Sequence, residues 1–130
     1  MKPRTLLTTA SLLTILLMTL HLTSDAVRAK AGNQEGGGST LVAVPVLFVW
    51  LYGTLMLGDR RSGRIIMLLG SIIGLGMPVV HSIGPTGLFT GQMNREPGPF
   101  IFIWTLHLLG VISMFSLVLA VRLLWRPPAD

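Results

Sequence analysis

The feature that most constrains this chain is a set of four long stretches that contain no Asp, Glu, Lys or Arg. Each stretch is 18 to 22 residues long, and a helix of roughly 20 residues crosses the roughly 30 Å hydrocarbon core of a bilayer. Val42–Leu51 is continuously apolar rather than alternating, which favours helices over membrane β-strands. We therefore predict an all-α membrane protein built as an antiparallel bundle of four transmembrane helices. The predicted spans are residues 5–22, 41–58, 65–83 and 100–121.

The composition supports an integral membrane protein and argues against a nucleic-acid-binding one. Only 12% of the residues are charged, whereas about 25% is typical of soluble domains. The chain has 130 residues, so we expect one transmembrane domain over residues 1–130. The net charge of +5 comes from basic residues in the short segments beside the spans, so we expect a bilayer and no nucleic acid as partner. The absence of cysteine excludes disulfides and thiolate chemistry.

The basic residues also predict the orientation of the spans. With the N-terminus inside, the cytoplasmic segments hold seven Lys and Arg residues and the outer segments hold three. Positive residues accumulate on the cytoplasmic side, so we expect a cell (inner) membrane protein with both termini in the cytoplasm. Segment 59–64 then forms a cytoplasmic hairpin. Its arginines can also contact anionic lipid headgroups, although a positively charged topological turn is the commoner role.

The first span has a second interpretation. Its basic start, its apolar stretch and Ala29-Lys30-Ala31 resemble a signal peptide, and cleavage there would leave three spans and a new N-terminus at Gly32. The apolar stretch is longer than the usual 7–15 residues, so we expect it to be retained. Segment 23–40, which includes Gly36-Gly37-Gly38-Ser39, is predicted to be a flexible outer loop.

Small residues in the third and fourth spans predict where helices pack. Gly70 and Gly74 form a GxxxG motif in an apolar context, which allows two helix backbones to approach closely. Gly110 and Ser113 lie on a similar small-residue face of the fourth span. Such faces also support contact with other membrane subunits or with a second copy of the chain.

Three histidines are the strongest chemical signal in the sequence. His21, His81 and His107 each continue a stripe of small or weakly polar residues, and each falls in the predicted outer half of its span. Ionisable residues in a membrane usually face the bundle interior. One hypothesis is a metal site formed by all three, with copper favoured by Met18 and Met77 one turn away. Another is a b-type haem held between His81 and His107. The commoner role is an amphipathic histidine near the interface.

No motif specifies a reaction, and none of the five carboxylates lies inside a predicted span. We therefore predict no catalytic residue and do not favour an enzyme. The leading hypothesis is a structural, accessory or assembly subunit that works through helix packing. The alternative is a haem- or copper-binding membrane protein for electron transfer or metal handling.

Overall fold

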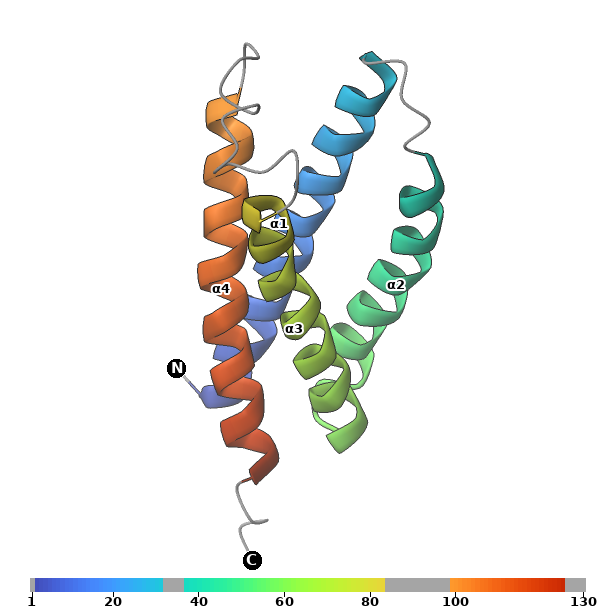
Figure 1. Cartoon of the computed structure of the whole chain (residues 1–130). Helices are drawn as coiled ribbons and strands as arrows, with labels where there is room; N and C mark the ends of the chain where they lie inside the picture. The colour runs from blue at the N-terminus through green and yellow to red at the C-terminus, as the bar shows by residue number, and fades with distance from the viewer. Residues whose placement is uncertain (1, 32–36, 84–98, 126–130) are drawn as a thin grey trace, which may run out of the picture.

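The computed structural model describes residues 2–31, 37–83 and 99–125, and within these residues it is entirely helical (Figure 1). The prediction of an all-α chain is confirmed. Three helices are long and apolar enough to cross a membrane, and a fourth contains the shorter apolar segment Val42–Met56. The four helices are α1 (Pro3–Ala31), α2 (Gly37–Met56), α3 (Arg61–Ile83) and α4 (Pro99–Trp125).

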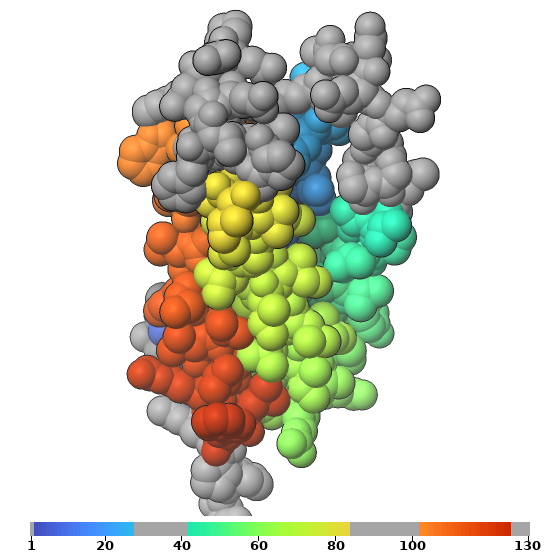
Figure 2. All heavy atoms as spheres, viewed as in Figure 1, coloured from blue at the N-terminus to red at the C-terminus, as the bar shows by residue number. Residues whose placement is uncertain are grey.

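Consecutive helices run in opposite directions, so the start of α1, the α2–α3 turn and the end of α4 lie at the same end of the bundle (Figure 1). We call this the arginine end, because Arg4, Arg60, Arg61, Arg64 and Arg122 belong to it. On the face drawn in Figure 2, α3 lies between α4 and α2. α1 packs against the other three helices.

Two predicted loops are shorter in the structure than in the prediction. α1 continues through Ala31 and α2 begins at Gly37, so the prediction of a loop over 23–40 is wrong for most of its length, and residues 32–36 lie outside the described residues. The predicted span stopped before the charged residues that follow it. A charged residue can lie beyond the apolar stretch and still belong to the same helix, as Asp25 does in α1. α3 likewise begins at Arg61, inside the predicted 59–64 hairpin, and the turn is closed by the Arg60 N–H, which donates to the Leu57 carbonyl at 2.8 Å.

Small residues close the space between the helices. A Cβ added to Gly74 would meet Ser113 Oγ of α4 and come within 3.0 Å of the Thr14 methyl of α1. A Cβ on Gly70 would enter the Trp50 indole of α2, and one on Gly110 would lie 2.9 Å from the Pro78 ring. Each of these glycines therefore lets a side chain of a neighbouring helix lie against its own helix backbone, where any larger residue would collide with it.

Buried hydroxyl groups add hydrogen bonds between the helices. The Trp50 indole N–H of α2 donates to Ser11 Oγ of α1 at 2.9 Å, and Ser11 Oγ lies 2.8 Å from Thr54 Oγ1. Ser71 Oγ of α3 lies 2.8 Å from Ser116 Oγ of α4. The core thus combines close packing with hydroxyl pairs, as expected where lipid supplies no hydrogen-bond partner.

Candidate functional site

His21, Asp25 and His81 converge at the end of the bundle opposite the arginine end. We call this group the His–Asp–His cluster. His21 and Asp25 are one turn apart on α1, so they share a helix face, and His81 comes from the last turn of α3. The extension of α1 beyond the predicted span is what brings the Asp25 carboxylate to the two imidazoles.

The two distances from the Asp25 carboxylate to the imidazoles are close to those between ligands of a metal ion. Asp25 Oδ2 lies 3.3 Å from His21 Nε2 and 3.6 Å from His81 Nε2. Ligands about 2.0–2.1 Å from a tetrahedral Zn²⁺ are separated from one another by about 3.3–3.4 Å. One donor atom from each of the three residues lies within 4.8 Å of the other two, so the two histidines would have to approach each other by up to about 1.4 Å to complete a three-ligand geometry.

The hydrogen bond on the other side of the His81 ring defines what its Nε2 can do. His81 Nδ1 lies 3.0 Å from the Met77 carbonyl. A carbonyl only accepts, so Nδ1 carries the proton, and in the neutral ring Nε2 presents a lone pair. That lone pair faces the Asp25 carboxylate, which is also an acceptor. A proton or a metal cation between them resolves this opposition, and a backbone carbonyl on the second ring nitrogen is the usual support of a metal-binding histidine.

Phe102, near the start of α4, forms a wall of the cluster. Its ring centroid lies 5.0 Å from that of His21 and 5.7 Å from that of His81, and the two imidazoles meet edge to face at 4.8 Å. His21 is only 1% exposed, whereas the Asp25 side chain is 40% exposed. The cluster therefore joins an exposed carboxylate to a buried imidazole beside an aromatic ring.

His107 lies outside the cluster, because the donor atoms that converge belong to His21, Asp25 and His81. The His107 side chain is exposed, and its Nδ1 lies 2.8 Å from the Ile103 carbonyl of its own helix. The predicted stripe advanced in steps of three residues, which rotate by about 60° per step relative to the helix face. Gly110, Ser113 and Ser116 are buried, and by this rotation His107 lies well away from the centre of that face.

The predicted haem between His81 and His107 gains no support from the structure. The His107 side chain is exposed, and the His81 ring meets the His21 ring at a centroid distance of 4.8 Å. Met18 is buried and Met77 partly buried, each one turn below a histidine of the cluster. The Asp25 carboxylate changes the ion that the ligands prefer from Cu(I) to a divalent ion. Carboxylate oxygen together with imidazole suits divalent ions, whereas the methionine thioethers suit Cu(I).

Asp25 is the site residue that the sequence analysis missed. It had been assigned to an outer loop because it follows the first charge-free stretch. The available signal was the spacing of His21 and Asp25, which are four residues apart and therefore neighbours on one face if the helix continues.

No protein-family model, curated protein or solved structure matches this chain. The chemistry of the described side chains is therefore the basis for assigning it a function.

Proposed function

We propose that this chain is a small integral membrane protein that binds a divalent transition-metal ion, Zn²⁺ or Cu²⁺, through His21, Asp25 and His81. The observation that carries the proposal is the convergence of the three donors within 4.8 Å. The ligand set, two imidazoles and one carboxylate, is one that binds such ions in proteins. In a tetrahedral site, three protein ligands leave a fourth position for an exchangeable ligand, which suits a protein that receives and passes on a metal ion.

The test is equilibrium dialysis of the purified full-length protein in detergent against Zn²⁺ or Cu²⁺, followed by metal analysis. We expect about one ion per chain. Asp25→Asn and His81→Ala remove a ligand and should weaken binding at least tenfold, because loss of even a supporting residue costs 10–100-fold.

His107→Ala is the matched control, because it removes an imidazole outside the cluster. Far-ultraviolet circular dichroism of each variant distinguishes loss of a ligand from loss of the fold. Equal affinity in the wild type, Asp25→Asn and His81→Ala would contradict the proposal.

A structural or accessory role through helix packing is the second candidate function. It is favoured by the glycine and hydroxyl contacts that join α1, α3 and α4, notably those at Gly74. In this case the His–Asp–His cluster is a hydrogen-bonded link between α1 and α3, and the partner is another membrane subunit or a second copy of the chain. Absence of metal binding, together with a lower melting temperature in Asp25→Asn, would favour this role.

We also propose that all four helices cross the bilayer, with the arginine end in the cytoplasm of a cell (inner) membrane protein. The basic residues of that end support this orientation. Retention of α1 is supported by its buried side chains, which include Leu7, Thr14 and His21. Cysteines introduced at Ser62 and Ser39 test the topology. An impermeant thiol reagent should label position 39 in intact cells and position 62 only after lysis, and the reverse pattern would overturn the orientation.

A further inference from the structure

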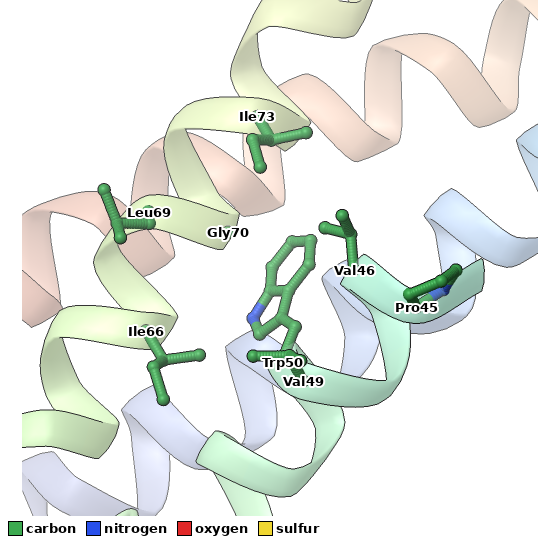
Figure 3. A pocket seen from close by; sticks show the side chains of 8 residues that line it. All are labelled: Pro45, Val46, Val49, Trp50, Ile66, Leu69, Gly70 and Ile73. Atoms are coloured by element: carbon green, nitrogen blue, oxygen red, sulfur yellow. The ribbon is translucent and has the colours of Figure 1, made fainter. Parts of the chain in front are cut away.

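An apolar groove lies between α2 and α3 on the surface of the bundle (Figure 3). Its volume is about 320 Å³, and it is lined by four residues from each helix. Figure 3 shows the Trp50 indole between the two helices, with Val46, Ile66 and Ile73 around it. Gly70 leaves the space that this indole occupies. Val46 and Ile73 are 40% and 44% exposed, so the groove opens to the surroundings of the bundle.

The α2–α3 turn, which joins the two helices of the groove at the arginine end, carries positive charge. Asp59 is the only acid of this end among the described residues, and Arg4 pairs with it at 2.8 Å. The Arg64 guanidinium is directed to α4, where it donates to the Leu123 carbonyl. Arg60 and Arg61 remain exposed at the start of α3. The α2–α3 turn below the groove is therefore cationic after its acid is neutralised.

The spacing along α3 fits a phospholipid. Arg61 and Ile66 are separated by an axial rise of about 7.5 Å, and Ile66 and Ile73 by about 10 Å. We propose that the groove holds one acyl chain of an anionic phospholipid whose phosphate contacts Arg60 and Arg61. The headgroup then lies at the turn, the glycerol beside the first turn of α3, and the chain against Trp50.

The charge of the turn argues for an anionic lipid over a zwitterionic one. A basic residue near the membrane surface attracts anionic lipid by about 1 kcal/mol, which is roughly fivefold in affinity for each arginine.

Quenching of Trp50 fluorescence by brominated phospholipids tests this proposal. The Trp104→Phe/Trp125→Phe background removes the other two tryptophans, both of which are exposed. The full chain in mixed micelles is titrated with phosphatidylglycerol or phosphatidylcholine that carry identical brominated chains. We expect quenching at an at least fivefold lower fraction of phosphatidylglycerol, and loss of this preference in Arg60→Gln/Arg61→Gln.

Arg122→Gln is the matched control, because Arg122 is exposed at the same end but on α4. A preference that survives Arg122→Gln and disappears in Arg60→Gln/Arg61→Gln supports the proposal. Equal quenching by both lipids overturns the anionic selection, and a preference reduced as much by Arg122→Gln shows only general surface charge. Val46→Phe fills the groove and should reduce quenching by either lipid. Unchanged quenching in that variant, or none in the wild type, overturns the acyl-chain site.

Discussion

The contacts between α1 and α3 are of two different kinds. In the middle of the bundle, Thr14 and Gly74 meet against Ser113 of α4, and the Thr14 hydroxyl is satisfied by the Ala10 carbonyl at 2.8 Å. At the histidine end, His21 and His81 meet around the Asp25 carboxylate. The first contact is closed by steric fit, and its Ser113 Oγ is buried with no hydrogen-bond partner in the described part of the chain, whereas the second brings together three titratable groups.

The difference follows from the donor and acceptor properties of the side chains. A threonine hydroxyl has one proton, and Thr14 donates it to a carbonyl of its own helix, so its donor needs no partner on another helix. A carboxylate that faces an imidazole nitrogen is satisfied either by a proton on that nitrogen, which makes an ion pair, or by a metal cation between the two groups. We therefore expect substitutions in the middle of the bundle to change stability, and substitutions in the His–Asp–His cluster to change the binding of protons and metal ions.

The largest expected effect breaks the steric contact. Gly74→Leu should destabilise the protein by about 3 kcal/mol or more, because even a Cβ meets Ser113 and Thr14 and overpacking typically costs 1–3 kcal/mol. Gly70→Leu should act similarly through Trp50. Thermal unfolding in detergent and the oligomer size from chromatography measure both effects.

Gly76→Leu is the control for these variants. A Cβ at Gly76 meets nothing within 4 Å, and leucine favours a helix over glycine by somewhat less than about 1 kcal/mol, so we expect unchanged or slightly higher stability. Equal melting temperatures for the position 70, 74 and 76 variants would show that close backbone approach does not hold the bundle together.

The next effect depends on the metal ion. Zn²⁺ at about one hundred times its dissociation constant should stabilise the wild type by about 2.7 kcal/mol, because the ion joins α1 to α3. Asp25→Asn should lose most of this gain, and His107→Ala should keep it. The gain should shrink as the pH falls from neutral to mildly acidic, since protons compete for the same nitrogens. A zinc-dependent shift that is identical in Asp25→Asn would assign the effect to another site.

The sequence predicted the helices better than the chemistry of the site. Absence of charge over about 20 residues is a strong signal because the cost of charge in lipid is large. The same signal failed at the boundary beyond Leu22, where α1 leaves the apolar stretch but remains helical through Ala31. Hydropathy predicts where a helix leaves the hydrocarbon core of a bilayer. The helix itself ends where the backbone hydrogen bonds stop, and the two positions can differ by several residues.

The histidines show why a face read from spacing is uncertain. His21 and His81 lie together in the structure. The stripes that lead to them mix steps of three and four residues and stay close to one helix face; they consist of Thr8, Ser11, Thr14 and Met18 in the first span and Met67, Gly70, Gly74 and Met77 in the third. The His107 stripe repeated steps of three and rotated away from the face. Periodicity does not identify which helices are neighbours. The contacts of Asp25 with His21 and His81 also depend on the extension of α1 beyond the apolar stretch, which hydropathy does not predict.

The smallest expected effect concerns the hydrogen-bonded hydroxyls of Ser71 and Ser116. It tests how much such a pair adds to the stability of the bundle. Ser71 Oγ donates to the Met67 carbonyl at 2.7 Å and lies 2.8 Å from Ser116 Oγ. Because Ser71 retains its local partner, the bond between helices adds little. Ser71→Ala, Ser116→Ala and the double variant form a thermodynamic cycle, whose coupling energy should be about 0.6 kcal/mol, the average for such bonds in membrane proteins. A coupling above about 2 kcal/mol would place this pair, and not Gly74, at the centre of bundle stability. A coupling of zero would leave close packing alone as the source of that stability.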